Sequence, residues 1–253
     1  VLVVATADHR VVMVTPPPHP VRRASAVLHS APIRDVVVVP SPNVWVGSST
    51  SLPKPLVATV ALDGFVGIVD VETGSVVAKM SVGEPAWSLA FVSGGGSKFL
   101  VGTGRGSVVV VEPSPNGAPP RRTVVVLQPA QGPVPYLRRL SETLLVAVGF
   151  TAAWAVRVRF DGSAAAIAQP VEGLAPRDRA QYAGLGVFPS SGLVAIASRG
   201  PVAHIQIGSL EDHGDGPARF SPRATLTGHT CAKLACGVDI VASGAVSDGV
   251  TLV

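Results

Sequence analysis

The side chains that could carry out acid–base or metal chemistry are few in this chain and are spread along it. Asp and Glu number 16 among 253 residues, and most fall in segments typical of turns, where Asp is common for local hydrogen-bonding reasons. A glycoside hydrolase would need two carboxylates facing one cleft, and no spacing here predicts such a pair. The segment Glu211-Asp-His-Gly-Asp215 is the densest acidic cluster, but it lacks regular ligand spacing. We interpret it as a solvated loop and expect no metal site.

Patterns typical of nucleophiles, zinc sites and phosphate loops are also missing from the sequence. It contains no Gly-x-Ser-x-Gly elbow and no Cys/His zinc spacing. Gly102-Thr-Gly-Arg-Gly106 has the glycines of a phosphate loop, but it joins two expected strands and opens no helix that could hold the anion. Cys231 and Cys236 are five residues apart, which along a strand directs them to opposite faces. We therefore expect no catalysis, no cofactor and no disulfide, and a reducing compartment.

The charge of the chain gives weak support for binding of a polyanion. Lys and Arg exceed Asp and Glu by four, and the pI is about 9.5. The arginine pairs lie far apart in sequence and have few aromatic neighbours to act as stacking platforms: they are Arg22-Arg23, Arg121-Arg122, Arg138-Arg139 and Arg157 with Arg159. Direct nucleic-acid binding is not expected. No apolar run approaches the roughly 18 residues of a membrane span, so no membrane partner is expected either.

The elements that must position these side chains follow from one apolar phrase that recurs six times. It reads Leu2-Val-Val-Ala-Thr-Ala7, Leu56-Val-Ala-Thr-Val-Ala61, Leu100-Val-Gly-Thr-Gly-Arg105, Leu145-Val-Ala-Val-Gly-Phe150, Leu193-Val-Ala-Ile-Ala-Ser198 and Ile240-Val-Ala-Ser-Gly-Ala245. The many Val residues, with 27 Gly and 23 Pro, favour short strands joined by tight turns. A period of about 40 to 50 residues built from strands resembles β-propellers of the WD or kelch kind, with one four-stranded blade per repeat.

Three further strands are expected around each phrase, although not every repeat has all of them. Strands after the phrase are predicted at His9–Val14, Phe65–Val71, Ser107–Val111, Ala153–Val158, Val202–Ile207 and Val250–Val253. Strands before it are predicted at Ile33–Val39, Ala86–Val92, Val134–Leu140, Tyr182–Phe188 and Cys231–Cys236. Fourth strands are predicted at Val21–Leu28, Ser75–Val82, Arg122–Leu127, Ala164–Ala168 and Arg223–Leu226. Together they predict an all-β propeller that forms a single domain, residues 1–253.

Both ends of this pattern are incomplete. The first repeat lacks its preceding strand, and the last stops at Val253, so we expect the chain to be an excerpt of a longer protein. About six blades are represented. Since rings of this kind usually close by pairing terminal strands, we expect seven blades in all, with six as the alternative.

The second repeat carries the landmarks of a WD repeat. It runs from Leu28-His29 through Ile33-Arg-Asp-Val-Val-Val-Val-Pro40 to Leu56-Val-Ala-Thr59, then Asp63-Gly64 and Asp70. This sequence resembles the WD family, in which His, Ser or Thr, Asp and Trp form a buried relay. The resemblance implies structural roles for His29, Thr59 and Asp63, while Val69 stands in place of the Trp. His229 in Leu226-Thr-Gly-His and Asp248 in Asp248-Gly249 are similar landmarks of the last repeat, and a structural role is expected for them too.

A narrower resemblance covers residues 30–112 and 222–253. Asp70-Val-Glu-Thr-Gly-Ser-Val-Val-Ala-Lys-Met80, Glu84-Pro-Ala-Trp87-Ser-Leu-Ala-Phe91 and His229-Thr-Cys-Ala-Lys-Leu234 are similar to the WD domain of the RING-finger and WD-repeat E3 ubiquitin ligases of the Fanconi anaemia and replication-stress pathway. This resemblance implies a substrate-binding module that recruits replication protein A in DNA repair, in the nucleus or else the cytoplasm. Zinc would belong to a RING outside this chain. The alternative is a structural WD40 scaffold in a large assembly for ribosome maturation, cilia or trafficking.

In propellers, the residues before the innermost strand and in the next hairpin turn line the face that commonly docks protein segments. Aromatic and Arg side chains there often dominate binding energy, and several Arg would suit an acidic partner. Trp87 and Tyr182 could equally pack between blades. The candidate partner-binding residues are Arg34, Trp87, Arg105, Tyr136, Arg138, Tyr182, Arg199 and Lys233.

Overall fold

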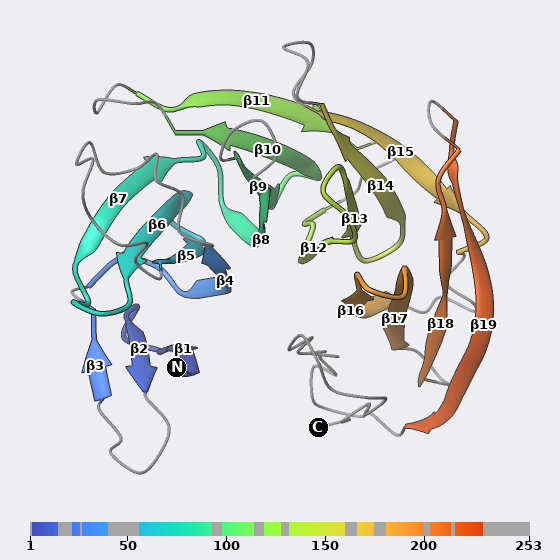
Figure 1. Ribbon diagram of the computed structural model, residues 1–253, viewed down its shortest axis with the longest axis horizontal. Helices are drawn as coiled ribbons and strands as arrows, with labels where there is room; N and C mark the ends of the chain where they lie inside the picture. Colours follow the sequence, from blue (N-terminus) through green and yellow to red (C-terminus); the bar gives the residue numbers. More distant parts are fainter. Residues whose placement is uncertain are drawn as a thin grey trace. The chain divides into compact units, whose positions relative to one another are not determined.

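The fold of the chain is built from β-strands. The computed structural model describes residues 2–14, 22–25, 27–39, 56–92, 98–113, 119–127, 132–159, 166–174, 181–199, 203–213 and 216–229. All regular secondary structure within these ranges is strand, labelled β1 to β19 (Figure 1). No helix long and apolar enough to cross a membrane occurs among them.

The chain's contacts group into two compact units. One comprises Val1–Gly104 with Val108–Val124, and the other Arg105–Ser107 with Val125–Val253. The expectation of a single domain over residues 1–253 stays a prediction.

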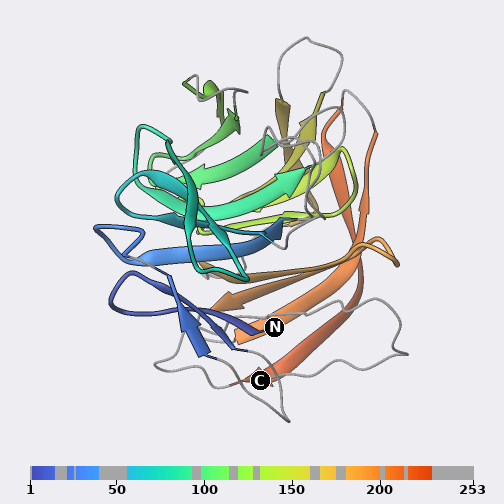
Figure 2. The same cartoon turned by 60° about the vertical axis from the view of Figure 1, so that its left-hand side comes forward.

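Apart from Ser107, Val125 and Val126, which belong to the second unit, the first unit contains three antiparallel sheets, each formed by strands that are consecutive in sequence (Figure 2). The three-stranded sheet has the order β1 (Leu2–Ala5), β2 (Val11–Val14), β3 (Arg22–Ala24). The next has the order β4 (Ile33–Val39), β5 (Leu56–Ala61), β6 (Phe65–Asp70), β7 (Val76–Ser81). The third has the order β8 (Ala86–Val92), β9 (Lys98–Thr103), β10 (Ser107–Glu112), β11 (Arg121–Val126).

The second unit contains two four-stranded meanders joined into one eight-stranded sheet. The first meander is β12 (Tyr136–Arg139), β13 (Leu144–Val148), β14 (Ala153–Val158), β15 (Ala166–Glu172). The second is β16 (Gln181–Phe188), β17 (Leu193–Arg199), β18 (Ala203–Glu211), β19 (Ala218–His229). They are joined where Val171 and Glu172 of β15 pair in parallel with Ala218 and Arg219 of β19.

Neighbouring sheets pack through their apolar faces. In the first unit one cluster combines Val60 and Ile68 of the sheet β4–β7 with Leu89, Phe91 and Phe99 of the sheet β8–β11. In the second unit a cluster combines residues of both meanders, among them Val146, Ala155, Tyr182, Ile196 and Phe220. Strands covered on both faces need no polar side, which is why β5 and β10 read as nearly continuous apolar runs.

The hairpin turn between β5 and β6 requires glycine. Gly64 has φ of 78°, a left-handed conformation that residues with a Cβ rarely adopt. A Cβ built there would also lie 2.9 Å from the carbonyl oxygen of Glu84. The Asp63-Gly64 pair thus fixes both the turn and its close approach to the chain before β8.

Most predicted strands agree with the structure within a few residues, and the largest differences occur at the fourth strands. β15 ends at Glu172 rather than Ala168, because it pairs with β14 as far as Pro170 and then with β19 at Val171 and Glu172. β19 spans 12 residues where a short strand was predicted, because β18 continues beside it to Glu211. β3 is shorter than predicted. The strands predicted at Cys231–Cys236, Ile240–Ala245 and Val250–Val253 lie outside the described residues.

Candidate functional site

Two β-bulges place Arg34 and Trp87 at equivalent points of neighbouring sheets. In the pairing of β4 with β5, Ile33 and Asp35 lie opposite consecutive residues, so Arg34 is extra. In the pairing of β8 with β9, Ala86 and Ser88 lie opposite two consecutive residues of β9, so Trp87 is the extra residue. A bulged residue leaves the ladder and its side chain is re-aimed.

The two bulged side chains stack on one another. The guanidinium carbon of Arg34 lies 4.3 Å from the centre of the Trp87 ring. Arg34 is exposed and Trp87 is half-buried. Trp87 also lies against the hairpin turn of its own sheet, where a Cβ on Gly104 would be 3.2 Å from the indole Nε1. Stacking uses the flat face of the guanidinium, so its in-plane N–H groups can still donate to a carboxylate.

Asp35, the residue after the first bulge, holds the two bulges together. Its Oδ2 accepts a hydrogen bond from the Leu89 amide on β8 at 2.9 Å. Its Oδ1 accepts from the Val36 amide at 3.0 Å. Since this carboxylate ties β4 to β8, it keeps Arg34 within stacking distance of Trp87. Sequence reasoning did not assign Asp35 a role, because only the register of the strands reveals it.

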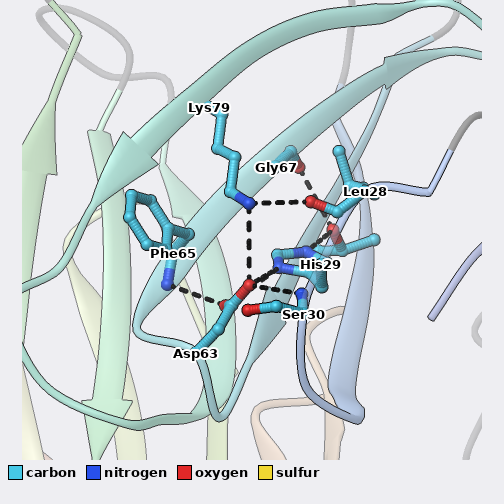
Figure 3. A network of polar contacts seen from close by, with 8 residues as sticks. Leu28, His29, Ser30, Asp63, Phe65, Gly67 and Lys79 are labelled. Carbon is cyan, nitrogen blue, oxygen red and sulfur yellow. Dashed lines mark hydrogen bonds and ion pairs between the residues drawn. The ribbon is translucent and has the colours of Figure 1, made fainter.

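A second constellation joins His29, Thr59 and Asp63, and Figure 3 shows His29 and Asp63 pointing toward one another. His29 precedes β4, and its side chain is 0% exposed. Its Nδ1 lies 3.0 Å from Oδ1 and 3.1 Å from Oδ2 of Asp63 in the β5–β6 turn. Its Nε2 lies 2.8 Å from Oγ1 of Thr59 on β5. These three residues thus meet as the WD resemblance implied.

The surroundings keep this histidine neutral. Burial lowers the pKa of His29, and the partly opposing attraction of Asp63 does not reverse that direction. Burial alone would raise the pKa of Asp63, but the Ser30 amide and His29 outweigh it, so the pKa of Asp63 is lowered. A neutral ring with its proton on Nδ1 donates to Asp63 and accepts at Nε2 from the Thr59 hydroxyl. The arrangement therefore acts as a structural clamp that ties the segment before β4 to β5 and to the β5–β6 turn.

Lys79 completes this constellation from β7. Its Nζ donates to the carbonyl oxygen of Leu28 at 3.0 Å and lies 3.6 Å from Oδ2 of Asp63. It also lies 4.6 Å from the centre of the Phe65 ring. The position expected to hold the relay's Trp is Val69, which is fully buried in an apolar cluster. Lys79 was not predicted, because a Lys on an outer strand has no distinguishing sequence signal.

The candidates of the second unit contact the protein itself. The Tyr136 hydroxyl donates to the Ala183 carbonyl, and an Arg138 Nη1 donates to the Leu137 carbonyl at 3.0 Å. Arg199 is exposed and donates to the Gln181 side chain at 2.8 Å. Tyr182 is only 2% exposed, and burial raises its pKa to about 12. Its assignment to a partner-binding surface was wrong, because the side chain lies in the core.

The remaining candidates are less informative. Arg105 is exposed in the turn after β9. Lys233 and Asp248 lie outside the described residues, and so does the side chain of His229.

The acidic segment after β18 is tied to the protein in part. Nε of Arg157 on β14 donates to Oδ1 of Asp212 at 2.7 Å, its Nη2 also contacts that oxygen, and Nη2 donates to the Gly216 carbonyl at 3.2 Å. Asp212 therefore anchors this connection to the neighbouring meander. Within the described part of the chain, no group of three or more His, Cys, Asp or Glu residues could hold a metal ion.

Comparisons with known proteins bear on the fold alone. No protein-family model matches the sequence, and no curated protein does. Among solved structures the fold is common, since 334 chains match it. One is the structure of U3-55K, a WD40 protein, with a TM-score of 0.59 and 12% sequence identity over 87% of this chain. The match spans 61% of U3-55K, so this chain corresponds to about three fifths of its length. The predicted WD40-type β-propeller fold is thereby confirmed, and the number of blades stays a prediction.

Proposed function

We propose that this chain is a protein-recognition module that binds an acidic segment of a partner through Arg34 and Trp87. WD40-type propellers typically serve as protein-interaction scaffolds, so the question is which surface of this one binds a partner. The stacked pair is the observation that carries the proposal: an exposed guanidinium is held 4.3 Å from a half-buried indole. Arg and Trp are the types most often found at the energetic centre of interfaces.

Preorganisation strengthens this assignment. Free Arg side chains lose rotamer freedom when they bind, but Arg34 is already oriented by its bulge and by the Trp87 ring. The bulge is in turn fixed by the bond from the Leu89 amide to Asp35. A carboxylate placed in the plane of the guanidinium would form two parallel hydrogen bonds, the geometry in which Arg binds carboxylates most strongly.

The partner we propose is replication protein A, with this chain as the substrate-binding part of a RING-type E3 ubiquitin ligase that acts at stalled replication forks in the nucleus. What supports this is the resemblance of residues 30–112 and 222–253 to that ligase family, a stretch that includes both Arg34 and Trp87. The RING and its zinc would lie outside this chain. No cofactor is assigned to the chain itself.

The experiment is a calorimetric titration of the chain with the winged-helix domain of the middle subunit of replication protein A. Arg34→Ala and Trp87→Ala are the test variants, and Arg223→Ala, which removes an exposed arginine of β19, is the matched control. The proposal requires micromolar binding that both test variants lose and the control keeps. If all three variants bind as tightly as the natural chain, the interface lies on another surface.

A structural role in a larger assembly is the second candidate. It is favoured by the contacts that Tyr136 and Arg138 make within the chain and by the burial of Tyr182, which reduce the surface available to a transient partner. Absence of any binding by the folded chain in the same titration would reject the ligase assignment and leave this scaffold role.

A further inference from the structure

The outer strand β11 is an unusual edge. It is the last strand of its sheet, in the order β11-β10-β9-β8, and no other described strand pairs with its outer side. Open edges present unpaired N–H and C=O groups to other chains, and proteins usually block them with charges, prolines or neighbouring strands. β11 ends in Thr123-Val-Val-Val126, a run with none of these features.

The outer strands β7, β15 and β19 each carry at least one such feature. β7 carries Lys79, whose ammonium group is held over Phe65 and Asp63. β15 pairs with β19 at Val171 and Glu172. β19 itself contains Pro222 and two register shifts along its pairing with β18. Among these outer strands, β11 combines two arginines at one end with an exposed valine run at the other.

The exposed side chains of β11 follow its pleat. Arg122, Val124 and Val126 alternate along the strand and are all exposed, while Thr123 and Val125 between them are half-buried. Val124 is 58% exposed and Val126 is 63% exposed. Because side chains at i, i+2 and i+4 share one face, the strand presents a row that begins with a cation and continues with two apolar groups.

The same residues direct their backbone groups outward. The Leu127 amide donates to the Gly106 carbonyl at 3.2 Å, at the beginning of β10. In antiparallel pairing, alternate residues direct both N–H and C=O to the same neighbour, so Val125 and Thr123 face β10 as Leu127 does. The N–H and C=O groups of Arg122, Val124 and Val126 then point away from the sheet, where an added strand would pair with them.

We propose that β11 accepts an extended segment of a partner protein as an added antiparallel strand, with apolar side chains beside Val124 and Val126 and acidic side chains beside Arg121 and Arg122. The two arginines favour acidic residues at one end of the incoming segment, and the two valines favour apolar residues along the rest of it. Antiparallel pairs are the commoner kind, which places the acidic residues at the C-terminal end of the incoming segment. This surface is separate from Arg34 and Trp87, so the inference stands without the function proposed above.

The probe is a synthetic peptide of about ten residues with alternating Val and Thr followed by Asp-Glu at its C-terminal end. The matched control peptide carries the same residues with Asp-Glu at its N-terminal end. Titration followed by NMR should shift the amide signals of residues 122, 124 and 126 with the probe and leave them nearly unchanged with the control. Equal shifts with both peptides, or none up to about 1 mM, would overturn the proposal.

Proline substitutions separate the outer edge from the inner ladder. Val124→Pro removes an N–H that points away from the sheet. It should leave the fold intact and weaken binding of the probe about tenfold or more. Val125→Pro removes an N–H that faces β10 and should lower the melting temperature. The reverse result, a stable Val125→Pro and an unfolded Val124→Pro, would contradict the assigned strand orientation and with it the proposal.

Charge reversal tests the selection of acidic residues in a chain that still folds. The double change Arg121→Glu and Arg122→Glu should abolish binding of the Asp-Glu probe and create binding of a probe ending in Lys-Lys. Unchanged preference for the acidic probe would overturn the role of the arginines. A concentration-dependent dimer in sedimentation experiments that Val124→Pro abolishes would assign the edge to a second copy of the chain, and would reject an acidic partner.

Discussion

Nε2 of His29 lies 2.8 Å from Oγ1 of Thr59, a contact that joins the segment before β4 to the middle of β5. The same hydroxyl lies 3.3 Å from the Gly67 carbonyl oxygen on β6. One hydroxyl proton cannot be donated fully to both, and with a neutral ring the shorter bond goes to His29. This contact makes the Thr59 hydroxyl the link between three segments of one sheet.

Removing this hydroxyl should cost stability. Thr59→Val keeps the shape of the side chain and leaves the buried Nε2 of His29 without its donor, a loss of about 1 to 3 kcal/mol in the free energy of unfolding. Thr59→Ser keeps the hydroxyl and is the matched control. Urea denaturation measures both. If Thr59→Val is as stable as the natural chain, the hydroxyl does not stabilise His29.

The lowered pKa of His29 predicts that acid weakens the fold. Because the folded pKa lies below the ordinary value of 6.5, the unfolded chain binds the proton more readily. The contribution of His29 is therefore complete above pH 6.5 and is lost as the pH falls toward the folded pKa. Asp63, whose pKa is also lowered, stays charged through this range and adds its own loss only below about pH 3.8.

The measurement compares the natural chain with His29→Gln, which cannot titrate, between pH 7.5 and 5. The difference in unfolding free energy should shrink as the pH falls, and the other histidines cancel because both chains contain them. A difference that grows on acidification would mean that His29 forms a charged pair with Asp63.

Two glycines allow steric contact to be separated from backbone conformation. Gly64→Ala places a methyl group 2.9 Å from the Glu84 carbonyl oxygen in a residue with φ of 78°. Gly192→Ala has a similar φ of 66° but meets nothing within 4 Å. We expect a loss of about 1 kcal/mol for Gly192→Ala from the left-handed conformation and a clearly larger loss for Gly64→Ala, measured by thermal unfolding. Equal losses would show that the turn can move away from Glu84.

The hydroxyl of Tyr182 is buried and has no hydrogen-bond partner among the described residues. Burying such a group without a partner is unfavourable, so Tyr182→Phe should leave stability unchanged or raise it by about 1 kcal/mol. Tyr136→Phe is the control. The Tyr136 hydroxyl donates to the Ala183 carbonyl, so its removal should destabilise the chain. Destabilisation of Tyr182→Phe would reveal a partner for this hydroxyl.

The strands could be predicted from the sequence because each repeat contains its own apolar, β-branched residues and turn residues. Phrases such as Leu56 to Ala61 combine β-branched residues with a glycine turn, and the structure has a strand there with the same bounds. His29, Thr59 and Asp63 could also be grouped, because their order along the repeat matches the WD landmarks. Local propensity and repeat spacing are enough for these features.

The bulges could not be predicted, and they decide which side chains reach the surface. At β4 and β8 the extra residue is the second of the strand, Arg34 or Trp87. At β16 the extra residue is Ala183, one position later, so Tyr182 stays paired with Ser198 and lies in the core. A shift of one residue reverses the face of a side chain, and nothing in the neighbouring sequence signals where the shift occurs.

The short parallel pairing of β15 with β19 makes the second unit continuous through its backbone. Val171 and Glu172 add a parallel pairing between two meanders that are also linked by side-chain packing, by the contact of Arg157 with Asp212 and by the bond from the Tyr182 amide to the Phe150 carbonyl. A pulling force applied to one meander is therefore transmitted to the other through backbone hydrogen bonds.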